Sequence, residues 1–258
     1  MSLDRRRFLC TTGLGLLAAS SARAMGLDGK VGIGLLAHGP GHAARPSAVE
    51  QLMWEVSKRT SIDVRETPET LDPKHPDLFR FPLLVWLGNG DCPPLSQEAR
   101  ARLQRYLRAG GTLFIDDASP EGDDAFDAAV RREVGALWPD APLARLDADH
   151  TLYRTFFLIE RPQGRVSRLP YLEGVSFDDR SPIVYGRNDL FGAFGRDGVG
   201  TWRLPVVPGG RTQREMAFRL GINLVMYATC LNYKRDQVHT TAILRRRRWR
   251  VESPRDTR

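Results

Sequence analysis

Three short, nearly continuous apolar runs alternate with amphipathic segments in the first half of the chain. The runs Val31–Ala37, Phe81–Leu87 and Thr112–Ile115 have the pattern of strands that are buried on both faces. Between them, residues 47–60 and 96–110 carry apolar side chains at helical spacing, with Ser47 and Ser96 as the predicted N-caps. The order strand, helix, strand, helix, strand is typical of right-handed crossovers in a parallel sheet.

The second half of the chain has weaker patterns that complete the same kind of fold. We expect a short strand at Ile62–Arg65, a loop at 68–76 and a helix at 123–137. A mixed extended stretch at 152–159 and strands at 172–177 and 182–185 should follow. The last element is predicted to be a central buried helix at 216–231, with Asn223 as a satisfied core amide. No internal repeat or low-complexity linker divides the chain. The sequence therefore predicts one α/β domain at residues 25–244, with a single doubly wound, mostly parallel sheet.

The N-terminus has the layout of a secretory signal. A basic stretch precedes an uncharged run of about fifteen residues, and Ala22 and Ala24 form a small-residue cleavage site. The order Arg5, Arg6, Phe8, Leu9 resembles the twin-arginine consensus, although Asp4 stands where Ser or Thr is usual. We therefore expect residues 1–24 to be a twin-arginine signal and the mature chain to be periplasmic or extracytoplasmic. The alternative is an amphipathic N-terminal helix of the fold.

Charge is concentrated at the two ends of the chain. The 258 residues carry a net charge of +7, of which residues 1–24 contribute +3 and residues 245–258 contribute +5, so that the part between them has −1. A nucleic-acid-binding domain should carry its basic charge on the folded part, which argues against that class. The basic segment Arg245–Arg250 is predicted to meet an anionic membrane surface or an acidic envelope protein, or else to be a solvated tail.

Composition narrows the class of protein further. The apolar fraction of 41% suffices for a core and argues against disorder. Only three cysteines are present, Cys10, Cys92 and Cys230, so a disulfide scaffold is excluded. No long apolar run follows the leader except residues 216–231, which contain Arg219. We expect no transmembrane segment in the mature chain.

Four segments resemble a known family. They are Leu95–Asp117, Asp149–Arg154, Leu172–Val175 and Gly221–Tyr227, and in this order and spacing they look like a bacterial family catalogued as domain of unknown function 4159. The resemblance implies a fold similar to that of class I glutamine amidotransferases, a flavodoxin-like sheet, and it implies no reaction. Relatives tend to have a histidine in the turn after the second buried strand, where this chain has Gly88–Asp91.

Polar residues that follow the buried runs are the candidates for a ligand site, because ligands of parallel sheets bind beyond the carboxyl ends of the strands. The predicted set is His38, Asn89, Asp91, Asp116, Asp117 and Asp189, with His42, Arg187 and Asn188 beside it. Asp116 and Asp117 could hold a hard cation together with Asp91, or one of the first two could act as a general base. Neighbouring strand residues face opposite sides, however, so caps of the following turns are the alternative.

A nucleophile is missing from the sequence patterns. An amidotransferase or related hydrolase needs Cys or Ser on a sharp strand-to-helix elbow. Cys92 is followed by two prolines, and Ser119 and Ser181 each precede a proline as turn residues do. Asp149 and His150 form either an acid–imidazole pair or a cap of the next element.

Two classes of function stay open at this point. The favoured one is a non-catalytic binding or assembly protein of the cell envelope, because the expected nucleophile is missing. The alternative is a hydrolase that uses the strand-end carboxylates, with or without a divalent metal ion. The sequence assigns no cofactor and no metal ligands.

Overall fold

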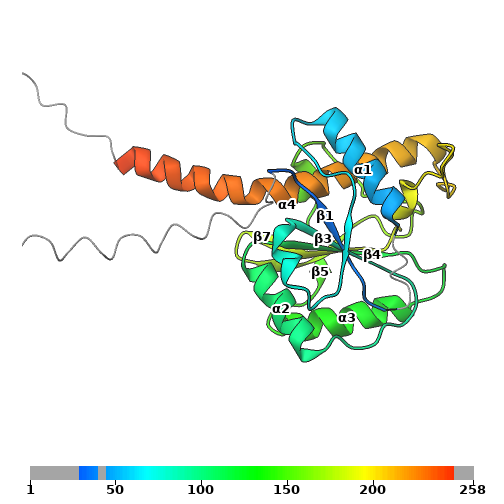
Figure 1. The fold of residues 1–258 in the computed structure, drawn as a ribbon, viewed down its shortest axis with the longest axis horizontal. Helices are drawn as coiled ribbons and strands as arrows, with labels where there is room; N and C mark the ends of the chain where they lie inside the picture. The colour runs from blue at the N-terminus through cyan, green and yellow to red at the C-terminus, as the bar shows by residue number, and fades with distance from the viewer. Residues whose placement is uncertain (1–28, 40–44, 247–258) are drawn as a thin grey trace, which may run out of the picture.

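The computed structural model describes residues 29–39 and 45–246, with side chains up to residue 230 (Figure 1). The predicted signal with Arg5, Arg6, Phe8 and Leu9 lies outside the described residues, as do His42 and the tail beyond Arg246. In the described ranges no helix has the length and apolar character needed to cross a bilayer.

One seven-stranded sheet forms the centre of the molecule, as predicted for a doubly wound α/β fold. The strand order is β2-β1-β3-β4-β7-β6-β5, and the first five of these are parallel. Their bounds are β2 Glu69–Leu71, β1 Ile33–Leu36, β3 Leu83–Gly88, β4 Thr112–Asp117 and β7 Arg180–Gly186. The last two strands, β6 (Glu173–Phe177) and β5 (Ala144–Arg145), extend the sheet in antiparallel fashion.

Helices cover both faces of the sheet (Figure 1). The helices α1 (Pro46–Arg59) and α4 (Gly210–Arg246) pack with η2 (Thr151–Arg154) and η3 (Phe191–Ala193) on one face. The other face is covered by α2 (Gln97–Arg108) and α3 (Ala125–Leu137), with η1 (Pro76–Arg80) near its edge. Because both faces are covered, every residue of β1, β3 and β4 is buried, which explains why these strands appear as continuous apolar runs.

Several predicted elements have different positions in the structure. Helix α1 begins at Pro46, so Arg45 and not Ser47 holds the N-cap position. Segment Ile62–Arg65 forms only an isolated bridge from Val64 to Val31, and the edge strand is β2, inside the predicted loop. Hydrophobic periodicity cannot identify β2, because this edge strand is short and two of its three residues are only partly buried or exposed.

Three further segments also differ from the predictions. Residues 152–159 begin with the short 3-10 helix η2 and are not extended. Ser181 lies within β7 and not in a turn. The last helix is longer than the apolar run, since α4 spans 37 residues and its second half extends away from the sheet (Figure 1).

Candidate functional site

The carboxyl ends of the parallel strands meet at one edge of the sheet. Strands β3 and β4 are adjacent and parallel, and Leu87 pairs with Asp116 and Gly88 with Asp117. Strand β7 lies on the other side of β4 and leads into Asp189. Three of the six predicted site residues, Asp116, Asp117 and Asp189, therefore lie together at this edge.

Asp116 is fully buried and faces the α1 and α4 side of the sheet. Its two carboxylate oxygens accept hydrogen bonds from the backbone N–H groups of Leu190 and Phe191, each at 2.8 Å. This carboxylate therefore caps the start of η3. Burial, together with the nearby Asp189 carboxylate, raises the pKa of Asp116 to about 7, against the opposing effect of the two N–H groups.

Asp189 is also fully buried and is neutralised by two arginines. Its two oxygens form short ion pairs with Arg45 and Arg165, and one oxygen also accepts the N–H of Gly192 at 3.1 Å. Asp189 has a φ of 48°, in the left-handed region that only some non-glycine residues adopt. The ion pairs join the loop after β7 to the N-terminal end of α1 and to the segment around residue 165.

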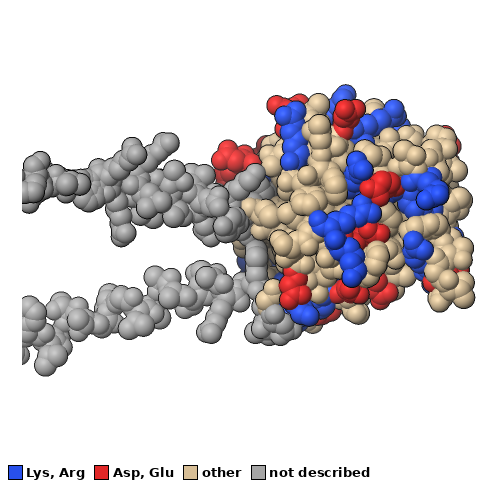
Figure 2. All heavy atoms as spheres, turned by 90° about the horizontal axis from the view of Figure 1, so that it is seen from above, with Lys and Arg blue, Asp and Glu red and all other residues tan. Residues whose placement is uncertain are grey.

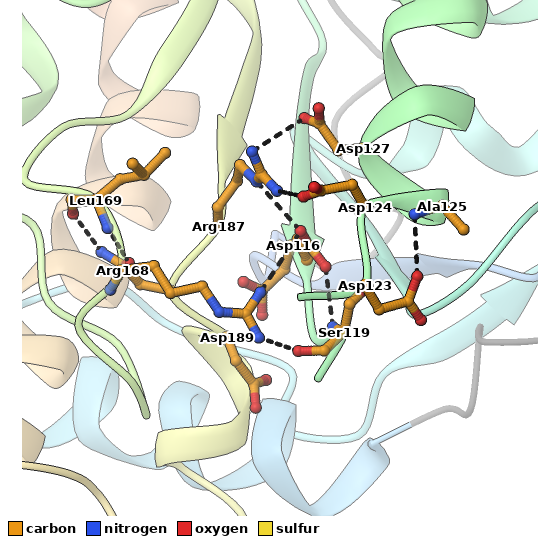
Figure 3. A network of polar contacts seen from close by, with 12 residues as sticks. Asp116, Ser119, Asp123, Asp124, Ala125, Asp127, Arg168, Leu169, Arg187 and Asp189 are labelled. Carbon is orange, nitrogen blue, oxygen red and sulfur yellow. Dashed lines mark hydrogen bonds and ion pairs between the residues drawn. The ribbon is translucent and has the colours of Figure 1, made fainter. Parts of the chain in front are cut away.

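Asp117 faces the opposite side of the sheet, as the alternation of strand side chains requires. One oxygen accepts the N–H of Ser119 at 2.9 Å and so fixes the turn after β4. The other oxygen lies 3.4 Å from Arg187 Nε, 3.7 Å from Arg168 Nη1 and 3.4 Å from the Tyr185 hydroxyl. Figure 3 shows the two arginines converging on this loop, where Arg187 also contacts the carboxylates at the start of α3.

The other three predicted residues do not join this group. His38 Nε2 lies 2.9 Å from the carbonyl oxygen of Pro93, and burial lowers the pKa of the ring. Asn89 is exposed. The Asp91 side chain is 75% exposed and forms a 3.6 Å ion pair with Arg132 on α3. No contact joins Asp91 to Asp117 in the part of the chain that the structure describes, and no group of three or more His, Cys, Asp or Glu side chains there is arranged to hold a metal ion.

The sequence did not reveal the arginines that surround the carboxylates. Arg45, Arg165 and Arg168 were not among the predicted site residues, and Arg45 is 144 positions away from Asp189. The only available signal was indirect, because a buried carboxylate requires a cation or several N–H donors. That requirement shows that partners must exist but not which residues they are.

Neither Cys92, in the loop after β3, nor Ser181, at the start of β7, has the geometry of a nucleophile. Cys92 is buried, and burial raises the pKa of its thiol to about 11, so it stays protonated at neutral pH. His150 Nδ1 accepts the N–H of Leu152 at 3.2 Å, which leaves the ring proton on Nε2, 3.1 Å from Ser181 Oγ. A catalytic histidine must accept the serine proton at that nitrogen. His150 is a cap of η2, which was one of the two interpretations of the sequence.

A pocket of about 630 Å³ lies beside this edge at the N-terminal end of α1. Arg45 and Ser47 line it from α1, Gly192 from η3, and Arg203 and Leu204 from the loop that follows. Arg203 donates through Nε to the carbonyl oxygen of Arg196. Arg45 is already paired with Asp189, and Glu50 also lines the pocket, so the charges of Arg203 and Glu50 balance and the lining does not favour an ion of either sign.

A family model described as "Domain of unknown function (DUF4159)" matches residues 32–229. The chain belongs to this family. The resemblance found in the sequence is thereby confirmed. The DUF4159 region runs from β1 into α4 and contains all the carboxylates and arginines described above. The chain matches no curated protein.

Proposed function

We propose that this chain is an exported, non-catalytic binding or assembly protein of the cell envelope. The observation that supports the proposal is that the strand-end carboxylates are already occupied by the protein's own groups. Both oxygens of Asp116 accept backbone N–H groups, and both oxygens of Asp189 are paired with arginines. This edge of the sheet is therefore held rigid and does not present free acid groups to a substrate.

The alternative function, a hydrolase, would need a carboxylate that can take a proton or bind a metal ion in contact with substrate. Asp116, Asp117 and Asp189 each have 0% exposure. A general base must come within hydrogen-bond reach of the proton it removes. None of these three side chains can meet that condition while the turns after β4 and β7 hold their places.

The proposal also takes the sheet to be similar to that of class I glutamine amidotransferases, without their nucleophile. The parallel order β2-β1-β3-β4-β7 supports this similarity. The loop after β3 contains Cys92, whose buried, protonated thiol lacks the reactivity that amidotransfer needs. A sheet of this architecture without a nucleophile fits a binding role.

Elemental analysis tests the non-catalytic assignment. The protein should be purified from the periplasm of its own host, without chelators, and analysed for bound metal. We expect no stoichiometric divalent metal ion. One metal ion per chain, lost together with a hydrolytic activity after dialysis against a chelator, would replace the binding function with the hydrolase.

Export by the twin-arginine route is tested by changing both Arg5 and Arg6 to Lys. The expected result is full-length precursor in the cytoplasm, because the twin-arginine pair is the feature on which this prediction rests. The control changes Arg7 and Arg23 to Lys, which keeps the same charge and leaves the pair intact. A shorter periplasmic form from the Arg5/Arg6 variant would contradict the route.

A further inference from the structure

A second pocket, of about 910 Å³, lies between α1, the first turns of α4 and the hairpin at residues 196–202. It shares no lining residue with the first pocket, which lies at the N-terminal end of α1. Figure 2 shows the face of the molecule on the α1 and α4 side, where basic and acidic side chains are interleaved. The charged residues that line the pocket are Glu55, Arg59, Arg196, Arg211, Arg214, Glu215 and Arg219.

Four of these charged side chains neutralise one another. Arg59 forms ion pairs of 2.7 Å with Glu55 and 2.8 Å with Glu215. Arg219 pairs with Glu215 at 3.0 Å. The two glutamates are therefore fully engaged on the α1 and α4 side of the pocket. They leave no carboxylate of the lining for the other arginines.

The remaining three arginines have no counter-charge in the lining, and two of them, Arg196 and Arg214, are held in place by backbone carbonyl oxygens. Arg196 donates to the carbonyl oxygen of Gly200, and Arg214, which is 8% exposed, donates to two backbone carbonyl oxygens. Arg211 is exposed in the first turn of α4. Within the described ranges, none of the three has a carboxylate at ion-pair distance, so the lining has an excess of three positive charges.

Trp202 fixes the two inner guanidinium groups. The guanidinium carbons of Arg196 and Arg214 lie 3.6 Å and 4.1 Å from the centroid of its ring. Both distances place the guanidinium group close over the ring. Burial lowers the pKa of Arg214, and the charge of Arg196 lowers it further. Keeping two like charges this close on one ring costs free energy, which an anion in the pocket would offset.

The hairpin itself does not supply that anion. Asp197, its only acidic residue, turns its carboxylate to the N–H groups of Val199 and Thr201 in the same loop. The segment from 25 to 244 has a net charge of −1, so the local excess is not a consequence of a basic body.

We propose that this pocket binds a multivalent oxyanion of the phosphate class, such as a diphosphate group, through Arg196, Arg211 and Arg214. Guanidinium groups with fixed orientation donate in pairs to phosphate oxygens. Arg214 uses only some of its five N–H donors on backbone carbonyl oxygens, and Arg196 uses one. Trp202 already contacts both guanidinium groups, so the ring orients these two arginines. The site deepens the proposed binding function by naming a ligand class.

The test is calorimetric titration of the full chain with inorganic pyrophosphate at low salt. The variants are Arg211→Gln, which loses no contact in the structure, and Arg196→Gln. The matched control is Arg108→Gln on α2, because Arg108 stacks on Trp138 at 4.9 Å in the same way but lies on the other face of the sheet. Thermal unfolding of each variant confirms that it is folded.

We expect each pocket variant to bind pyrophosphate at least tenfold more weakly, and the Arg108 variant to bind as the unchanged protein does. Affinity should fall as salt is raised, and acetate should not compete. Equal affinity in all variants, or no binding by the unchanged protein, would overturn the site and leave the non-catalytic function standing. Hydrolysis of pyrophosphate would have the opposite meaning, since it would keep the site and reject the non-catalytic function.

A second arm identifies the source of the phosphate group. The unchanged protein and the Arg211→Gln variant are sedimented with vesicles that contain phosphatidic acid. Binding that requires Arg211 assigns the site to a lipid headgroup, and binding that is equal in both assigns it to a soluble phosphorylated compound. Either result is consistent with the site when the pyrophosphate titration has shown the expected loss.

Discussion

Asn223 shows at the scale of one residue how a polar side chain is used inside the core. It is fully buried on α4, accepts the N–H of Phe157 at 2.7 Å, and donates to the carbonyl oxygens of Leu152 and Phe157 at 2.9 Å and 2.8 Å. The amide therefore satisfies backbone groups of a segment that has almost no regular structure of its own. The prediction of a satisfied core amide is confirmed.

Replacing Asn223 by Ala should lower the free energy of unfolding by roughly 3 kcal/mol, because it leaves buried backbone groups without partners. Urea unfolding monitored by circular dichroism measures the change. Thr229→Ala on the same helix is the control, since the partners of the Thr229 hydroxyl, two carbonyl oxygens and the Cys230 thiol, all belong to its own helix. A loss for Asn223→Ala no larger than for the control would mean that residues 152–157 are held by other contacts.

The raised pKa of Asp116 predicts a specific dependence of stability on pH. The carboxyl group has a pKa near 3.8 in the unfolded chain and about 7 in the folded protein. Between these values the unfolded chain has released a proton that the folded protein keeps, so the contribution of Asp116 to the free energy of unfolding falls as pH rises from about 4 to about 7. Above pH 7 this contribution stays constant.

The Asp116→Asn variant isolates this effect. Guanidinium unfolding of both proteins at several pH values between 4 and 8 gives the difference in stability. We expect the free energy of unfolding of the unchanged protein to fall relative to that of the variant as pH rises from about 4 to about 7. Above pH 7 the difference between the two proteins should stay constant. A difference that is the same at every pH would show that Asp116 ionises in the folded protein at its ordinary pKa.

At the scale of elements, the two serines predicted as N-caps differ. Ser96 precedes α2, and its hydroxyl accepts the N–H of Ala99 at 3.2 Å. Ser47 lies inside α1, one residue after Pro46, and α1 has no side-chain cap. Both positions look alike in the sequence, because each is a serine ahead of an amphipathic stretch. The Arg45 ion pair with Asp189 anchors the start of α1 instead.

Alanine substitution separates the two serines. Ser96→Ala should lower the free energy of unfolding by about 1 kcal/mol, because it removes a true N-cap. Ser47→Ala should change it by less than about 0.5 kcal/mol. Thermal or urea unfolding of the two variants measures both values. Equal losses would show that the Ser47 hydroxyl supports α1 in solution.

At the scale of the whole molecule, the basic C-terminal segment Arg245–Arg250 is predicted to act independently of the core. Among the side chains that the structure describes, which end at residue 230, Ala228 is the last member of a buried cluster, and α4 continues to Arg246. We expect deletion of residues 245–258 to leave folding intact and to abolish salt-sensitive binding to acidic vesicles. Each Arg near an anionic surface adds about 1 kcal/mol, and the attraction decays over roughly 8 Å at physiological salt.

Vesicle sedimentation at two salt concentrations measures the effect of the deletion, with neutral vesicles as the control surface. A variant with every Arg of 245–250 changed to Gln keeps the length of the chain and tests charge alone. Equal vesicle binding by the full and shortened chains would identify the segment as a solvated tail. A large fall in the unfolding temperature on deletion would show that it packs against the domain.

The local pattern of the sequence determined the class of fold. Strands covered on both faces must be apolar throughout, and helices that cover a sheet must be apolar on one side, so β1, β3, β4, α2 and α3 leave clear signals in their own residues. The same reasoning placed Asp116 and Asp117 at the carboxyl edge and on opposite faces of the sheet. These conclusions need only neighbours along the chain.

Only the tertiary structure decided which residues meet. The partners of Asp189 and the edge strand β2 in place of Ile62–Arg65 join distant parts of the chain. The contacts of Arg196 and Arg214 with Trp202 join a hairpin to the helix that follows it. A charged residue in a sequence of 38 basic and 31 acidic side chains has many possible partners, and nothing local selects one. The selection is made when packing of the sheet and helices brings particular surfaces together, because burial then penalises every charge or polar group left without a partner.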